Sequence, residues 1–139
     1  MEIESFKHQH VEILSAIAAL RKYAHAGIKE HAGDIAGLIV SMNTVIKVHL
    51  AVEDRVLYPA LQEGEDKALA DMGRHYQEEM KDIASAYIAF SRHWNTPTQV
   101  ANDPEKFRAE ANTVLRRVHE RMQKENTEFY PAIERSQKR

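Results

Sequence analysis

The chain has 139 residues, with 19 lysines and arginines against 21 aspartates and glutamates, and it has no cysteine. This length predicts a single domain over residues 1–139, and the near-zero net charge argues against a nucleic-acid partner. The lack of thiols excludes disulfides, thiolate zinc sites and iron–sulfur clusters, so nitrogen and oxygen atoms must hold any metal. We expect a cytoplasmic protein with no signal peptide, no membrane span and no membrane partner.

Glycine and proline are scarce, and they fall where helices would end. Residues 5–25 have the three-and-four spacing of an amphipathic helix, and a loop follows over residues 26–33. Asp34 is expected to cap a second helix that ends before Gly64. The inward positions of these two helices are Phe6, Ile13, Ile17, Leu20 and Ala24, then Leu38, Met42, Val45, Ile46, Val52 and Val56.

The second half of the chain repeats this pattern. A third helix is predicted from Glu65 to Trp94, and a loop over residues 95–103 follows it. Asp103 and Pro104 are an N-cap and a first-turn proline, which predict the start of a fourth helix. The two stripes are Leu69, Met72, Ile83, Ala86 and Phe90, then Phe107, Ala111, Leu115, Val118, Met122 and Phe129. Four helices with short connections predict an all-α, antiparallel up-down-up-down four-helix bundle.

One histidine borders the apolar stripe of each predicted helix, and three glutamates share these inward positions. The histidines are His10, His49, His75 and His119, and the glutamates are Glu53, Glu79 and Glu125. Buried carboxylates are costly unless they are paired or bound to a metal, and the helical rise brings these groups to one level of the bundle. A metal site in the core follows, although pairing among the side chains in a structural bundle stays open. Heme is disfavoured because it needs only one or two axial ligands.

Seven nitrogen and oxygen ligands suit two first-row metals, and iron is the best fit. The segments that carry these residues are H-L-A-V-E-D-R-V-L-Y-P-A-L at 49–61 and H-E-R-M-Q-K-E-N-T-E-F-Y-P-A-I at 119–133. With His10 before V-E-I-L, and with His75, the chain resembles the hemerythrin family, also called HHE cation-binding domains. The resemblance implies a four-helix bundle with two iron ions, bridged by carboxylates and an oxo or hydroxo group. Histidines would be the terminal ligands.

Two positions depart from the family pattern. Glu79 stands where the family has a second histidine in the third helix, and Gln123 and Lys124 stand where it has an acid in the fourth. Glu125 is the candidate instead, because it precedes its Tyr-Pro pair by the same distance as Glu53. On an ideal helix His119 and Glu125 point about 120° apart, unless a π-bulge redirects them.

The extra carboxylate is expected to favour ferric iron and reaction with oxygen over reversible oxygen carriage. The resemblance implies a partner such as dioxygen, peroxide or nitric oxide, in oxygen or redox sensing, stress protection or iron handling. A metal- and oxygen-binding protein is favoured over a dedicated enzyme, although peroxide or ferroxidase-type activity stays an option. The protein is expected to be a monomer or a homodimer. The alternatives are a non-redox metal-binding module and a structural bundle without turnover. Tyr58 and Tyr130 are expected to pack rather than to bind.

Overall fold

The computed structural model describes residues 3–138, and within this range it contains helices and turns but no strand. The helices are α1 (Glu4–Ala26), α2 (Ala32–Val52), α3 (Tyr58–Glu63), α4 (Lys67–Trp94), α5 (Pro97–Asn102), α6 (Pro104–Lys124) and α7 (Tyr130–Gln137). Two π-helical segments, η1 (Glu53–Leu57) and η2 (Glu125–Phe129), join α2 to α3 and α6 to α7. The predicted all-α class is confirmed.

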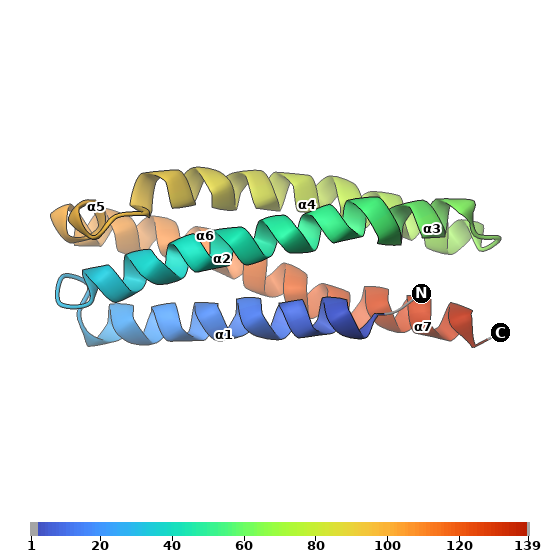
Figure 1. The fold of residues 1–139 in the computed structure, drawn as a ribbon, viewed down its shortest axis with the longest axis horizontal. Helices are drawn as coiled ribbons and strands as arrows, with labels where there is room; N and C mark the ends of the chain where they lie inside the picture. Colours follow the sequence, from blue (N-terminus) through green and yellow to red (C-terminus); the bar gives the residue numbers. More distant parts are fainter. Residues whose placement is uncertain (1–2, 139) are drawn as a thin grey trace.

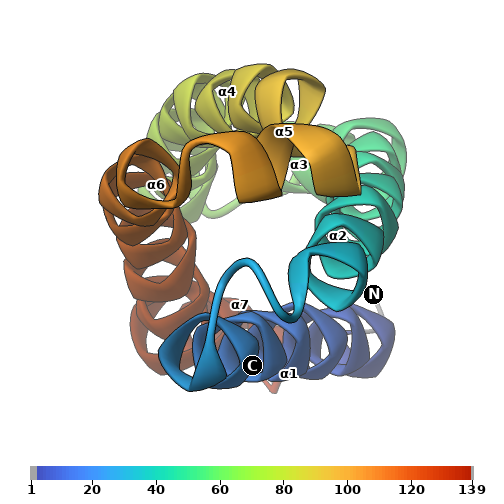
Figure 2. The ribbon, with the colours of Figure 1, turned by 90° about the vertical axis from the view of Figure 1, so that its left-hand side faces the viewer.

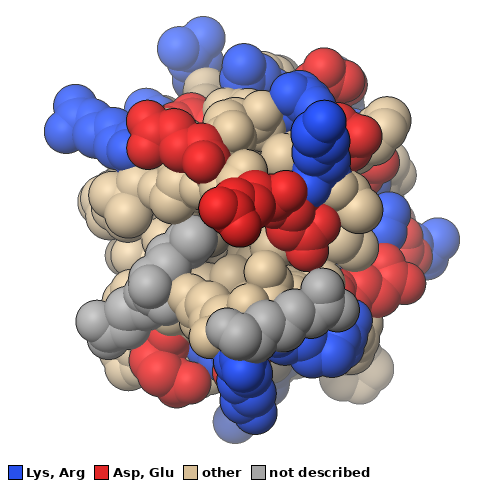
Figure 3. Space-filling view, turned by 90° about the vertical axis from the view of Figure 1, so that its right-hand side faces the viewer, with Lys and Arg blue, Asp and Glu red and all other residues tan. Residues whose placement is uncertain are grey.

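The long helices α1, α2, α4 and α6 run along the long axis of the molecule, and each reverses the direction of the one before it (Figure 1). Viewed from the end, they surround a common centre, and α5 lies at one end of the bundle, in contact with α2, α4 and α6 (Figure 2). Contacts of α1 with α2, α2 with α4, α4 with α6 and α6 with α1 close the ring. The other end carries α3, α7 and the start of α1, and acidic side chains lie over the middle of its surface (Figure 3).

Side-chain caps start α4 and α6. Asp103 accepts a hydrogen bond from the Lys106 N–H at the start of α6, with Pro104 in the first turn, as predicted. Asp66 caps α4 in the same way. The predicted cap at Asp34 is wrong, because α2 already begins at Ala32 and Asp34 lies in its first turn, where a negative charge favours the helix dipole.

The predicted loop over residues 95–103 contains the short helix α5. Thr96 caps it by accepting a hydrogen bond from the Gln99 N–H, and Pro97 follows in its first turn. Val100 of α5 is fully buried. One cap and one buried residue stabilise a helix of this length. The sequence predicted a loop because the segment is rich in turn-forming residues.

The π-helical segments have a local cause in the two Tyr-Pro pairs. The Tyr58 N–H donates to the Glu53 carbonyl, five residues back, and the Tyr130 N–H donates to the Glu125 carbonyl in the same way. The proline that follows each tyrosine has no N–H and would clash with the carbonyl of an α-helical turn, which a wider turn relieves. Val56, predicted to point inward, lies in the first of these turns and is 53% exposed.

The core has two apolar clusters with a polar layer between them. Along α1, α2 and α6, the layer falls between residues of the larger cluster, such as Ile13 and Met122, and residues of the smaller one, such as Phe6 and Phe129. The buried charged or ionisable residues of this layer are His10, His49, Glu53, Arg121 and Glu125. Hydrophobic packing above and below therefore shields the layer from water.

One expectation about membranes needs correction. The helical stretch Ala32–Glu63 is 32 residues long and holds an 18-residue window of mean hydropathy 1.7, so it is long and apolar enough to cross a membrane. Only 33% of that window is buried in the protein. The core helix of a soluble bundle meets the same criterion.

Candidate metal centre

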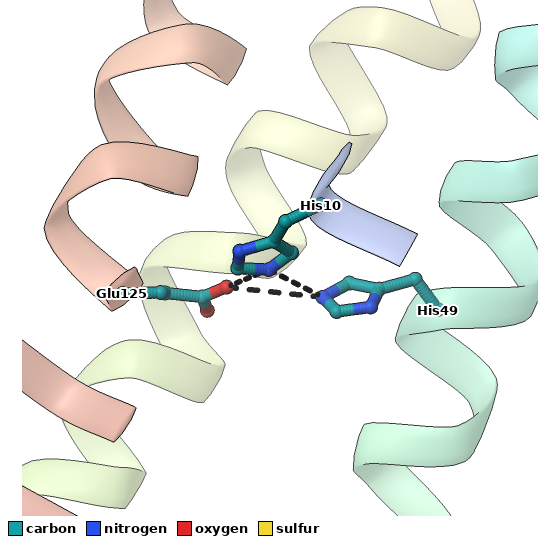
Figure 4. A group of neighbouring side chains, drawn as sticks. All are labelled: His10, His49 and Glu125. Atoms are coloured by element: carbon teal, nitrogen blue, oxygen red, sulfur yellow. Dashed lines mark hydrogen bonds and ion pairs between the residues drawn. The ribbon is translucent and has the colours of Figure 1, made fainter. Parts of the chain in front are cut away.

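Four predicted ligands converge in the polar layer. His10 comes from α1, His49 from the last turn of α2, and Glu53 and Glu125 are the first residues of η1 and η2, and all four are 0% exposed. The His10 Nε2 lies 2.8 Å from the Glu125 Oε1, and the His49 Nε2 lies 3.8 Å from the same oxygen (Figure 4). The Glu53 Oε1 lies 3.2 Å from the His49 Nε2, but without hydrogen-bond geometry.

A hydrogen bond through Nδ1 fixes the orientation of each histidine ring. The His10 Nδ1 donates to the Asn126 side-chain oxygen at 2.8 Å, and the His49 Nδ1 donates to the Gln9 side-chain oxygen at 2.6 Å. Each Nε2 therefore faces the centre, and the two Nε2 atoms are 3.2 Å apart. Neutral imidazoles would place two lone pairs against each other, so a proton or a metal ion must lie between them.

The electrostatics of the metal-free cluster favour a proton there. Burial lowers the pKa of His49, but the Glu125 and Glu53 carboxylates raise it more, to about 9. Burial and the charge of Glu125 raise the pKa of Glu53. Burial also acts to raise the pKa of Glu125, but its interactions with the two histidines and the charge of Arg121 lower it overall. A metal ion that enters the cluster would displace a proton from His49.

Tyr130 adds a hydroxyl to this cluster. Its oxygen lies 3.0 Å from the His10 Nε2 and donates to the Glu53 Oε2 at 3.3 Å. Burial and the two nearby carboxylates raise its pKa, so it remains a neutral phenol. Tyr58, at the corresponding place in the other Tyr-Pro pair, is buried, and its hydroxyl has no hydrogen-bond partner among the described residues. We expected both tyrosines to pack rather than to bind, and for Tyr130 this expectation is incomplete because its hydroxyl joins the cluster.

A model of the family described as hemerythrin HHE cation binding domain matches residues 1–133. The chain belongs to this family. A search of curated proteins and a search of solved structures returned no match. The cation-binding description of the family and the buried cluster of His10, His49 and Glu125 both point to metal binding.

The α4 residues expected to complete a hemerythrin-like site face outward. His75 is exposed, and the Glu79 side chain is 53% exposed. The inward orientation predicted for both is wrong, because the buried positions in this part of the helix are Tyr76 and Met80, each one residue further along the chain. One residue is a rotation of about 100°, which separates the core face from the flank.

His119 of α6 is half-buried, and the structure does not bring it into the cluster. Its neighbour Val118 takes the core position. The π-helical turn that the sequence required at Glu125 is present, but it begins at Glu125 itself. It therefore aims that carboxylate without redirecting a side chain six residues earlier.

Arg121 is a buried charged residue that sequence reasoning missed. It is 3% exposed, and its Nε donates to the Glu125 Oε2 at 3.0 Å. Its Nη1 donates to the Glu79 Oε2 at 3.3 Å, and its Nη2 donates to the Tyr76 carbonyl. A signal was present in the sequence, since Arg121 precedes Glu125 by the same four residues that separate His49 from Glu53.

Proposed function

We propose that this protein binds iron through His10, His49, Glu53 and Glu125 and uses it to interact with dioxygen or its reduced products. The observation that carries the proposal is the facing pair of histidine Nε2 atoms, 3.2 Å apart, with each ring anchored through Nδ1. Two carboxylates flank that pair, so the donor set is two nitrogens with carboxylate oxygens. Such a set holds non-heme iron in many oxygen-reacting proteins.

The surroundings suit a small apolar ligand. The Phe6 ring packs edge-on against His49, with ring centroids 5.9 Å apart, and the Tyr130 ring stacks on His10 at 5.0 Å. These aromatic groups keep water from the polar layer, an environment that favours a small, weakly polar ligand such as dioxygen or nitric oxide. Bound iron would supply redox chemistry, and four protein ligands leave room on an octahedral ion. Tyr130 holds a proton beside the histidines, where it can donate to a small anion.

The first test compares two matched pairs of variants. His49→Ala and Glu53→Ala remove buried cluster residues that lie four apart on α2 and η1, whereas His75→Ala and Glu79→Ala remove exposed residues with the same spacing on α4. We would measure the metal content and optical spectrum of protein purified aerobically without added metal. We expect metal to be lost in the first pair and kept in the second. Absence of metal in the unaltered chain, with no anaerobic uptake of ferrous iron, would refute the proposal.

The oxygen half of the proposal needs a second measurement. Ferrous protein prepared without oxygen would be mixed with dioxygen, peroxide or nitric oxide, and its absorption followed over time. A spectral change that disappears in His49→Ala supports binding at the cluster. Steady-state consumption of peroxide would mark an enzyme, and a single stoichiometric change would mark a binding or sensing protein. The cytoplasmic location and the monomeric or homodimeric state stay predictions.

A further inference from the structure

The two oxygens of the Glu125 carboxylate face different cationic partners. Oε1 lies 2.8 Å from the His10 Nε2, on the side of the histidine pair. Oε2 accepts a hydrogen bond from the Arg121 Nε at 3.0 Å. A carboxylate that bridges two metal ions offers one oxygen to each. In this chain a guanidinium already holds the second oxygen.

Arg121 is fixed in place from several directions. Its side chain is 1% exposed, and it binds carboxylates of Glu125 and Glu79 as well as the Tyr76 carbonyl. Its guanidinium carbon lies 4.4 Å from the centre of the Tyr76 ring. A guanidinium remains charged at every pH at which proteins fold, and a buried one is costly to separate from its carboxylate. Arg121 therefore provides a permanent positive charge beside Glu125.

Among the described residues, those that face the core on the same side of the cluster are poor donors for a second ion. The α4 residues that face the core there are Tyr76 and Met80. The Tyr76 hydroxyl donates to the Glu128 Oε2 at 3.1 Å, and a thioether suits softer metals than iron with oxygen ligands. Glu79 is bound by Arg121 and by Lys124, whose Nζ lies 3.8 Å away. The histidines predicted for this side, His75 and His119, are outside the cluster.

We infer that each chain holds one metal ion, and that the Arg121 guanidinium takes the position beside Glu125 that a second ion would take. The inference rests on the proposed function and departs from the two-iron centre that the family resemblance implied. One divalent ion and one guanidinium carry three positive charges, which match the three carboxylates of Glu53, Glu125 and Glu79, and Arg121 contacts the last two of these. Arg121 is a positioning residue, since it acts on the metal through Glu125.

Counting metal in the unaltered chain decides the inference. Protein stripped of metal would be loaded anaerobically with ferrous iron, freed of excess metal by gel filtration, and measured by mass spectrometry. A parallel sample loaded with Mn²⁺ would be examined by electron paramagnetic resonance. We expect one ion per chain and the spectrum of an isolated ion. Two ions, or the spectrum of a coupled pair, would overturn the inference and leave the proposed function standing. No bound metal would overturn both.

Variants of Arg121 test whether its charge matters to the metal. Arg121→Gln removes the cation that competes for Glu125, so the affinity for Mn²⁺ is expected to rise by about tenfold. Arg117→Gln, an exposed arginine one turn earlier on α6, is the control and should leave the affinity unchanged. Arg121→Lys keeps the charge and should bind one ion with an affinity within about threefold of the unaltered chain. Equal affinities in Arg121→Gln and Arg117→Gln would contradict the role of Arg121. If Arg121→Gln fails to fold, the metal count and the lysine variant still decide.

Discussion

Two segments of the molecule, residues 49–59 at the end of α2 and residues 121–131 at the end of α6, share one design. Each begins with a basic residue, places a buried glutamate four residues later, starts a π-helical turn at that glutamate, and ends in Tyr-Pro. The turn widens before each proline and directs the carboxylate into the polar layer. The segments differ at their first residue, which is His49 in one and Arg121 in the other.

That difference separates two roles within one layer. His49 can exchange a proton for a metal ion, because a neutral imidazole has a free lone pair. Arg121 has no lone pair to offer and stays charged. The same backbone arrangement thus places Glu53 next to His49, where a proton can exchange for a metal ion. It places the Glu125 Oε2 next to the permanently charged guanidinium of Arg121. Substitutions made in pairs, one in each segment, can test this asymmetry.

The largest difference is expected between Glu125→Gln and Glu53→Gln in metal-free protein. Glu125→Gln leaves a buried guanidinium without its carboxylate partner and should lower the free energy of unfolding by about 3–5 kcal/mol. Glu53→Gln should cost less than about 1 kcal/mol, because the Glu53 Oε1 has no hydrogen-bond partner among the described residues and burial already raises the pKa of this carboxyl. Urea unfolding followed by circular dichroism measures both free energies. Equal losses of stability in the two variants would argue against the role of Arg121 as a fixed charge beside Glu125.

The pH dependence of stability should come from the His49 segment. The pKa of His49 rises from 6.5 to about 9 on folding, so its contribution is fully present below pH 6.5 and lost as the pH rises through 9. Metal-free protein should lose up to about 3 kcal/mol of stability over this interval.

Bound metal takes the place of the His49 proton, so metal-loaded protein should not show this loss. Melting temperatures between pH 6 and pH 9, with and without a chelator, give the comparison. A melting temperature that stays level in the chelated protein would show that no proton is held between the histidines.

A smaller effect is expected from the prolines. Pro59→Ala and Pro131→Ala restore an N–H and allow an α-helical turn, which rotates Glu53 or Glu125 away from the centre. Metal affinity should fall by about tenfold, or about 1.4 kcal/mol, in each variant. Pro104→Ala at the start of α6 is the control and should bind as the unaltered chain does. Affinities from metal titration that match Pro104→Ala would mean that the wide turns persist without proline.

The two tyrosines should give the smallest effect. Tyr130→Phe removes the hydrogen bond to Glu53 and should destabilise metal-free protein by about 1 kcal/mol. Tyr58→Phe removes a buried hydroxyl that lacks a partner among the described residues, and it should be neutral or slightly stabilising. Thermal unfolding of the two variants measures the difference. A larger loss in Tyr58→Phe would reverse the assignment.

The parts of the fold that the sequence predicted are those where local signals agree. The predicted stripe from Phe107 to Phe129, along α6 and η2, is buried throughout, and Asp103 and Pro104 mark the start of α6. His10, His49, Glu53 and Glu125 were recognisable as polar residues at core positions, and the structure brings them together. The distance to the Tyr-Pro pair also identified Glu125 correctly as the counterpart of Glu53.

The errors arose where burial contradicts residue type. The buried face of α4 includes Gly73 and Ser91, which are not apolar, and the phase of this helix was assigned one residue too early at His75. Arg121 four residues before Glu125 has the spacing of an ordinary surface ion pair. The burial of Arg121 depends on Tyr76 and Glu79 in another helix, and no local pattern in α6 reports that contact.

The layer also joins the two ends of the chain. His10 and Asn126 are separated by 116 residues and meet through a hydrogen bond behind the metal-facing nitrogen. An ion held by His10 and Glu125 would close almost the whole polypeptide into one loop, as a disulfide does in proteins that have cysteine. For this cysteine-free chain, the metal is thus also the available cross-link between its first and last long helices. Loss of the ion would first free α1, and the earliest proteolytic cut in chelated protein is expected there.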